Sequence, residues 1–381
     1  MKAWIILVLS LAPPGAFGQT GTTEVGGYVK DLFSRTESSS APTAWDNLIH
    51  ARLNTAWYPW NQFSGVLQLR GRVYYGNSVE NTPGFADNLK SDAGFGPLGS
   101  TLWAGKQTVA YLEADRLYLN WTPGKWQFTA GRQRIAWGTN LVWNPMDVFN
   151  PLSVLDFDYE ERPATDAVRL QYYTGVVSKI ELVVKPGSAA SPPITASQLT
   201  FNEWDYDFHI LGGDRDGRWF AGAGWAGDIL GGGFRGEVLA SKVPDAAIVL
   251  GSHRVMVSGA VSGDYTFPNS FYIHTEVLYN SEGVVKNASL TRPLAQILGL
   301  LSPARWSIYQ EFSCDVSPLV RASVFTLVNP VDGSFVAVPS VTWSAATNID
   351  MMFLALAFSG APLTEFGGEG TAVFGRIKFS F

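Results

Sequence analysis

Polar and apolar residues alternate along most of the chain, in segments of about ten residues. Segments 67–73, 271–280 and 373–381 show the pattern most clearly, with apolar side chains at every second position. A period of two places successive side chains on opposite faces of a β-strand. Repeated strands of this kind are typical of a membrane β-barrel. A soluble β-sandwich also alternates, so the pattern alone leaves both architectures open.

Short and long connections alternate between these segments. Short turns are predicted near 59–62, 122–125, 174–176, 202–205, 227–232, 267–270, 315–318 and 345–348. Long segments are predicted at 34–46, 76–107, 137–163, 280–304 and 359–370, with a short helix within 293–301. Bacterial barrels have an even number of strands, short periplasmic turns and longer outer loops. The spacing therefore predicts an all-β fold, a single antiparallel transmembrane barrel of about 18 strands, with 16 as the alternative.

Aromatic residues gather at the ends of the predicted strands, and this favours the barrel over the sandwich. The clusters contain Trp57, Tyr58, Trp60, Trp121, Trp126, Tyr265, Phe267 and Phe271. Aromatic rings prefer the headgroup layer of a bilayer and form girdles around membrane barrels.

The first residues have the composition of a secretory signal. Lys2 precedes an apolar stretch that Pro13 interrupts, and small residues lead up to Gly18. We expect residues 1–18 to be a signal peptide and residues 19–381 to be the barrel, with no plug domain before its first strand. The last residue is Phe381, and a final strand ending in Phe resembles the signal read by the bacterial barrel-assembly machinery. After the leader, no window approaches the roughly 18 consecutive apolar residues of a membrane helix.

Composition narrows the function. Charged residues make up 16% of the chain, below the roughly 25% of an average soluble domain. A single cysteine excludes an internal disulfide framework and a cysteine-based metal cluster, and four histidines leave little room for a histidine-rich metal site. The net charge of −6 argues against a general nucleic-acid binder. We expect no metal and no cofactor.

Arginines dominate the inward positions of one predicted wall. Parity along the strands turns Arg52, Arg70, Arg72, Arg116 and Arg169 toward the lumen. A barrel of this width leaves an aqueous interior unless loops fill it. We therefore predict a pore lined by a basic wall.

The long segment 137–163 is acidic and joins two strands of that wall. Its acids are Asp147, Asp156, Asp158, Glu160 and Glu161, against Arg162 alone. If the segment folds inward, acids and arginines face each other across the lumen, and their field favours polar solutes. The alternative is a loop that caps the wall, with the charges merely paired.

The predicted fourth and fifth strands carry further charges. Pairing across the 122–125 turn puts Asp115 opposite Arg132 and Glu113 opposite Arg134. Opposite charges directly across an antiparallel pair attract each other, so we predict cross-strand ion pairs here.

Strict alternation places these charges, and Asp166 with them, on the lipid face. An arginine near the membrane midplane costs about 2–4 kcal/mol there. We favour a β-bulge at Gly131 that turns Arg132 and Arg134 toward the lumen and adds them to the basic wall. The alternatives are charges above the membrane and a structural ion-pair ladder without a role in transport.

Several short motifs resemble those of a known group. They are Gly131–Arg134 followed by Trp137-Gly138, then Trp143–Pro145 and Asn150-Pro151, with a later hairpin at Tyr265–Asn269. Together they resemble a porin-like family of bacterial outer-membrane barrels with a Gly-Arg-Gln-Arg strand leading into a Trp-Gly loop. Over a shorter stretch they resemble alginate-export-type barrels. The resemblance implies a channel in the outer membrane of a Gram-negative cell, and an arginine-rich pore if the second comparison holds.

Three functions remain open from the sequence. The first is passive diffusion of small polar solutes, with outer-membrane lipid around the barrel. The second is export or uptake of anionic saccharides along the arginines, since transport needs weak, multiple binding. The third is an outer-membrane enzyme or a loop-plugged structural barrel. His50 and His274 are the histidines on inward positions, and neither has an evident catalytic partner. We expect no enzyme, and no sequence feature selects between a monomer and an oligomer.

Overall fold

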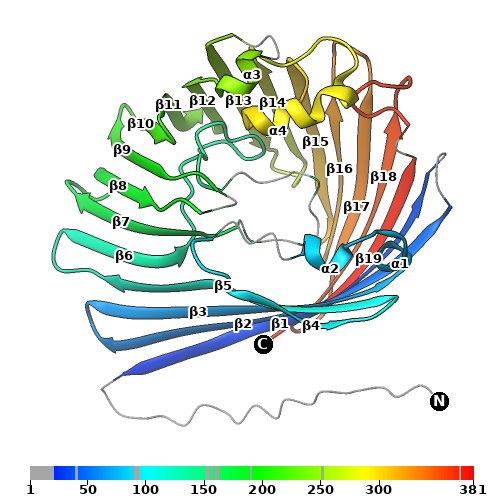
Figure 1. The fold of residues 1–381 in the computed structure, drawn as a ribbon, viewed down its shortest axis with the longest axis horizontal. Helices are drawn as coiled ribbons and strands as arrows, with labels where there is room; N and C mark the ends of the chain where they lie inside the picture. Colours follow the sequence, from blue (N-terminus) through cyan, green and yellow to red (C-terminus); the bar gives the residue numbers. More distant parts are fainter. Residues whose placement is uncertain are drawn as a thin grey trace.

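The strands of this chain follow one another around a closed ring (Figure 1). The computed structural model describes residues 21–38, 42–89, 94–150, 155, 158, 161, 163–188, 191–249, 253–368 and 370–381. Its strands are β1 (Thr22–Glu37), β2 (Ala44–Trp60), β3 (Phe63–Gly76), β4 (Gly99–Ala104), β5 (Thr108–Trp121), β6 (Trp126–Gln133), β7 (Thr165–Tyr173), β8 (Lys179–Lys185), β9 (Ile194–Glu203), β10 (Tyr206–Arg215), β11 (Arg218–Ile229), β12 (Gly232–Lys242), β13 (Val255–Thr266), β14 (Tyr272–Asn280), β15 (Trp306–Ser317), β16 (Val320–Val328), β17 (Phe335–Ala346), β18 (Ile349–Ser359) and β19 (Thr371–Ser380). The helices are α1 (Asn77–Asn81), α2 (Phe85–Asn88), α3 (Asp245–Val249), the 3₁₀-helix η1 (Ala288–Thr291) and α4 (Arg292–Leu298).

Eighteen of these strands close the barrel. The ring is closed by the pairing of β1 with β19. Most of β3 pairs directly with β5, so β4 is not one of the strands that form the ring. The short strand β4 pairs with one part of an edge of β5, and β6 pairs with another part of the same edge. The prediction of 18 strands is confirmed, and the alternative of 16 is wrong.

Turns and loops separate to the two rims of the barrel as predicted. Each predicted short turn joins two paired strands, and several contain a residue with positive φ, such as Asp205, Ser270 and Asn348. Asp, Asn and Ser tolerate this conformation and are common in hairpin turns. α4 forms at the predicted stretch 293–301 and begins one residue before it, with a proline in its first turn and Gly299 at its C-terminal cap. None of the helices in the described ranges is long and apolar enough to cross a bilayer.

Outward and inward positions differ sharply in chemistry. On β2, Ile49 and Leu53 point outward and are 46% and 37% exposed, while His50 and Arg52 are 0% and 2% exposed. Aromatic residues near the short turns are also exposed and pack on one another, as in the stacked pair Trp121 and Phe128, 5.4 Å between ring centroids. An apolar exterior with an aromatic band matches a barrel solvated by lipid.

Three outer loops meet at one buried carboxyl group. Glu365, in the β18–β19 loop, accepts hydrogen bonds from Ser302 Oγ at 2.9 Å and Asn329 Nδ2 at 3.1 Å. These partners belong to the β14–β15 and β16–β17 loops. Burial, only partly offset by the two hydrogen bonds, raises the pKa of Glu365 to about 7.

The contact between these loops should therefore weaken as the pH rises. A carboxyl group with a raised pKa binds its proton more tightly in the closed loops than in water. Its stabilising effect is complete below pH 4.5, its ordinary pKa, and is lost as the pH rises to about 7. The expected loss is about 3 kcal/mol. Hydrogen exchange of amides 361–368, corrected for the intrinsic rate, should show less protection at pH 8 than at pH 5.

The variant Glu365→Gln separates this effect from a general response to pH. Glutamine keeps the hydrogen-bonding capacity and does not titrate, so its protection should be the same at both values. Equal protection at pH 5 and pH 8 in the unmodified chain would contradict the assignment.

Candidate functional site

The connection between β6 and β7 runs through the interior of the barrel (Figure 1). We call the described residues between 134 and 164 the interior loop. Two wall carboxylates hold its backbone. Glu237 on β12 accepts hydrogen bonds from the N–H groups of Thr139, Asn140 and Met146, the last two at 2.9 Å. Glu276 on β14 accepts from Val142 N at 3.1 Å and Trp143 N at 2.6 Å. Both carboxylates are almost fully buried, 2% and 0% exposed.

A third wall carboxylate holds the start of the same loop. Glu181 on β8 accepts a hydrogen bond from Trp137 Nε1 at 2.5 Å. Arg169 on β7 donates two hydrogen bonds to the same carboxylate, each 2.8 Å long, and Lys179 Nζ lies 3.2 Å from it. Two cations therefore balance one buried acid, which is the condition under which a buried charge is tolerated.

Apolar packing holds this part of the loop as well. Ile135 and Met146 are completely buried, and Trp137 packs edge-on against Phe149 with 5.0 Å between ring centroids. They form one cluster with Val183 and other inward residues of β7 to β11. The interior loop is thus a packed element of the structure along this wall.

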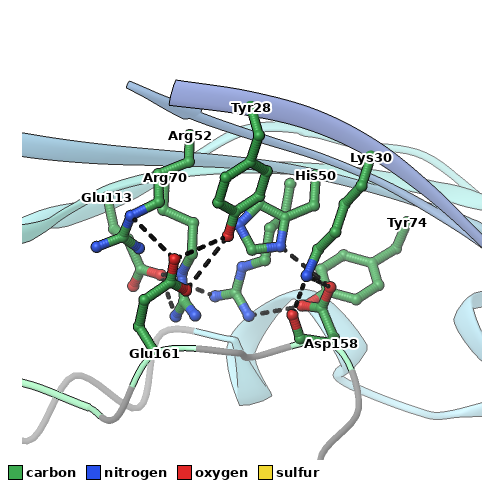
Figure 2. A network of polar contacts seen from close by, with 10 residues as sticks. Tyr28, Lys30, His50, Arg52, Arg70, Tyr74, Glu113, Asp158 and Glu161 are labelled. Carbon is green, nitrogen blue, oxygen red and sulfur yellow. Dashed lines mark hydrogen bonds and ion pairs between the residues drawn. The ribbon is translucent and has the colours of Figure 1, made fainter. Parts of the chain in front are cut away.

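Farther along, the interior loop reaches β1 and β2 (Figure 2). Asp158 lies 3.0 Å from His50 Nδ1 and 3.3 Å from Lys30 Nζ. Glu161 accepts hydrogen bonds from Tyr28 Oη at 3.2 and 3.3 Å. It also lies 3.6 Å from Arg52 Nε. The loop therefore contacts walls on both sides of the lumen.

The charge of Asp158 persists across the ordinary pH range. Burial opposes its ionisation, but the hydrogen bond to His50 and the charge of Lys30 outweigh burial and lower the pKa of Asp158 to about 2. The contact with β1 and β2 is therefore fully formed above the ordinary pKa of 3.8 and is lost only in strong acid.

The predicted pairing of Asp115 with Arg132 is wrong. Asp115 lies 2.6 Å from Arg52 Nη2, on the inner face. The β5–β6 register places Leu117, not Asp115, opposite Arg132. A one-residue irregularity in the β3–β5 register also turns Asp115 inward, because Gln68 faces Arg116 and Leu69 faces Ala114, which leaves Asp115 without an opposite residue. A bulge of this kind reverses the side-chain parity of the strand above it.

The predicted pairing of Glu113 with Arg134 is also wrong, because β6 ends at Gln133 and the bulge turns Glu113 to the inner face. Glu113 Oε1 accepts a hydrogen bond from Arg70 Nε at 2.5 Å and from Arg72 Nη2 at 3.2 Å. Arg134 follows the last residue of β6, and its side chain is exposed.

The bulge predicted at Gly131 does not turn Arg132 inward. The β6–β7 register runs without interruption, with Arg132 directly opposite Asp166 on the outward parity. Arg132 Nε donates to Asp166 Oδ1 at 2.8 Å, and its Nη2 donates to the carbonyl of Gly96 at 3.0 Å. Phe95 N donates to Asp166 Oδ2 at 2.6 Å. The insertion before β4 thus shields this outward pair, which remains only 6% exposed at Arg132.

The remaining predicted residues lie in separate places. Arg116 is half-buried on β5, opposite Gln68. Asp147 does not join the acids near β1 and β2. It lines a cavity on the opposite wall together with Lys185 and Arg215. Asp156, Glu160 and Arg162 lie outside the described residues.

Sequence reasoning missed the three wall acids Glu181, Glu237 and Glu276. Alternation along β14 already separated Glu276 from the apolar residues of its strand, so the sequence indicated that Glu276 points into the barrel. Glu237 and Glu276 bind backbone N–H groups of the interior loop, and backbone groups leave no pattern in a sequence. Glu181 binds the distant side chain of Trp137 and two cations of the wall. The positions of these acids on the inner face could therefore be predicted from the sequence, but their role in holding the loop could not.

Comparisons with known proteins support the fold. No family model matches the chain, and no curated protein matches it. Similar solved structures include OccAB2 of Acinetobacter baumannii, with TM-score 0.59 and 8% identity over 94% of this chain and 98% of that one. OccK11 (OpdR) of Pseudomonas aeruginosa has TM-score 0.56 and 9% identity, over 94% and 96% of the two chains. OmpF of Salmonella typhi, in complex with daunomycin, has TM-score 0.52 and 10% identity, over 94% and 97%.

At such low identity the likeness concerns the fold. The closed antiparallel ring, its apolar exterior and these comparisons define a transmembrane β-barrel with the fold of outer-membrane porins. Among such barrels, this chain has eighteen strands in the ring and a loop anchored to both sides of the lumen.

Removing Glu237 should release the first half of the interior loop. In Glu237→Ala, three loop N–H groups lose their common acceptor in a buried site, which costs about 1–3 kcal/mol for each group left unpaired. We expect protease cleavage within 137–149 while the barrel stays folded, measured by gel mobility without heating. Glu203→Ala is the matched control, because Glu203 is exposed at the end of β9. Equal resistance of the two variants would show that the loop does not depend on this carboxylate.

Proposed function

We propose that the chain forms an outer-membrane channel for passive diffusion of small polar solutes. The main support is the contrast between the two faces of one closed sheet, shown by Ile49 outside and Arg52 inside on the same strand. Barrels of sixteen to eighteen strands are wide enough to enclose an aqueous path. A polar interior then offers a route that avoids the cost of moving polar groups into hydrocarbon.

The interior loop supports small solutes as the substrates. Glu237 and Glu276 hold it to one wall, and Lys30 and Arg52 contact its acids at the other. A chain segment attached on both sides narrows the path at this level. We propose that Asp158 and Glu161, together with the arginines of β2 and β3, line this narrowing.

The contacts of the arginines favour passive diffusion over saccharide transport. Arg52 contacts Asp115, and Arg70 and Arg72 both contact Glu113. Acids that neutralise neighbouring guanidinium groups weaken their attraction for a polyanion. An enzyme with His50 as its base is also disfavoured, because this side chain is completely buried beside Asp158 and offers no surface to a substrate.

Conductance measurements on the purified chain in planar bilayers test the proposal. The unmodified chain should give stepwise conductance. In the double variant Asp158→Asn, Glu161→Gln, the cations Lys30 and Arg52 lose nearby negative charge, so the permeability ratio of chloride to potassium should rise about twofold or more. Because the pKa of Asp158 is about 2, the contribution of Asp158 to this change should be the same from pH 5 to pH 8.

A charge change outside the lumen provides the control. Glu80→Gln removes one acid from an outer helix, where Glu80 pairs with the exposed Lys106, and should leave selectivity unchanged. If the unmodified chain gives no conductance, the channel function is wrong. If the chain conducts and the double variant keeps the original selectivity, the two acids do not line the path.

A further inference from the structure

A group of cations lines a cavity at the outer ends of β8 to β12. The cavity has a volume of about 480 Å³. Its lining contains Lys185, Arg215, Arg218 and Lys242, and a single carboxylate, that of Asp147. We call these four cations the vestibule cluster. None of them belongs to the wall of arginines that the sequence predicted.

The vestibule cluster differs from Arg52, Arg70 and Arg169 in its partners. Lys185 Nζ donates to Ser191 Oγ at 2.5 Å, and Arg215 Nη2 donates to the carbonyl of Val148 at 2.8 Å. Both acceptors are neutral. Across the described ranges, none of the four cations forms an ion pair with a carboxylate, whereas Arg52, Arg70 and Arg169 all do.

Two arginines of the cluster lie directly opposite each other. Arg215 ends β10 and Arg218 begins β11, and the register of this hairpin pairs them. Like charges in opposite positions repel each other. Arg215 Nε is also buried without a hydrogen-bond partner. An anion between these residues would relieve the repulsion and supply the missing acceptor.

The other side of the cavity is apolar. Phe149 from the interior loop, Leu239 and Met256 from the wall and Leu298 from α4 all contribute to it. A volume of this order is typical of pockets for small organic ligands. Guanidinium groups match the planar, two-oxygen geometry of carboxylate and phosphate.

We propose that this cavity is a binding site for a small organic anion, in which an apolar body contacts the Phe149 side and a carboxylate or phosphate group contacts Arg215 and Arg218. The site lies at the ends of β10 and β11 that face away from the short turns near 202–205 and 227–232. This inference rests on the proposed channel, because it treats the cavity as part of the outer mouth. It adds a preference for anions at the mouth that the neutralised arginines farther inside do not provide.

Binding to the purified barrel in detergent tests the site independently of conductance. Isothermal titration with benzoate, phenyl phosphate and benzyl alcohol compares two anions with a neutral molecule of the same apolar body. We expect at least one anion to bind and benzyl alcohol to bind about tenfold more weakly or not at all. The stronger of the two anions identifies the acidic group that the site prefers.

Variants then assign the binding to the two arginines. The double variant Arg215→Gln, Arg218→Gln should weaken anion binding about tenfold or more. Arg254→Gln removes one exposed cation from an outer loop and should bind as the unmodified chain does. Gel mobility without heating shows whether each variant is folded, and Arg218→Gln alone replaces the double variant if the latter is not.

The outcomes separate this inference from the proposed function. Anion binding that the arginine variants abolish, in a chain that gives no conductance, would support the site and overturn the channel. Conductance without binding of either anion, or binding that the variants leave unchanged, would overturn the site. Equal binding of benzyl alcohol and the anions would also overturn it, because the apolar body alone would then account for the affinity.

Discussion

The structure depends on how a segment inside a barrel satisfies its backbone. A loop that leaves the wall and crosses the interior takes N–H groups away from bulk water, and each buried group needs an acceptor. Glu237 on β12 and Glu276 on β14 provide acceptors for five such groups. A carboxylate accepts several hydrogen bonds at once, and bonds to a charged acceptor are stronger than neutral ones. These two side chains therefore hold the part of the loop around 139–146 against the wall.

The inward cations fall into two groups, those that form ion pairs with buried acids and those that have no ion pair with a described carboxylate. Arg169 and Lys179 balance Glu181, and Arg52 is balanced by Asp115 and Glu161. Each of these cations reduces the cost of burying an acid and gives up its attraction for a solute. In the vestibule cluster, Lys185 and Arg215 have neutral partners, and it is their unneutralised charge that the proposed anion site uses. A count of inward arginines therefore says little about selectivity until each one is matched with its partner.

Alternation and turn chemistry were sufficient to predict the barrel, because both are local properties. The turns around Asn348 and Asp205, and the inward position of Arg70, follow from residues that are neighbours in the sequence. The partners of Asp115 and Glu113 do not, since a single extra residue in β5 reverses the parity above it. Arg132 was placed wrongly for another reason. Its parity was regular, and the groups that shield it come from Phe95 and Gly96, which are distant in the sequence. The position of the interior loop also depends on contacts between residues that are distant in the sequence, and no local pattern predicts such contacts.

The early end of β6 connects these features. When β6 leaves the wall after Gln133, the upper part of β5 would be left with an unpaired edge, which a barrel in lipid cannot tolerate. β4 takes that place beside Thr108–Glu113, and the segment before it bonds to Arg132 and Asp166. Gly131 allows the departure, because its φ of 120° and the carbonyl of Leu117, 2.3 Å from where a Cβ would lie, both exclude a larger residue. The insertion that carries β4 and the interior loop are thus two parts of one arrangement. β4 covers the edge of β5 that β6 leaves unpaired, so a change in either part alters the pairing of β5.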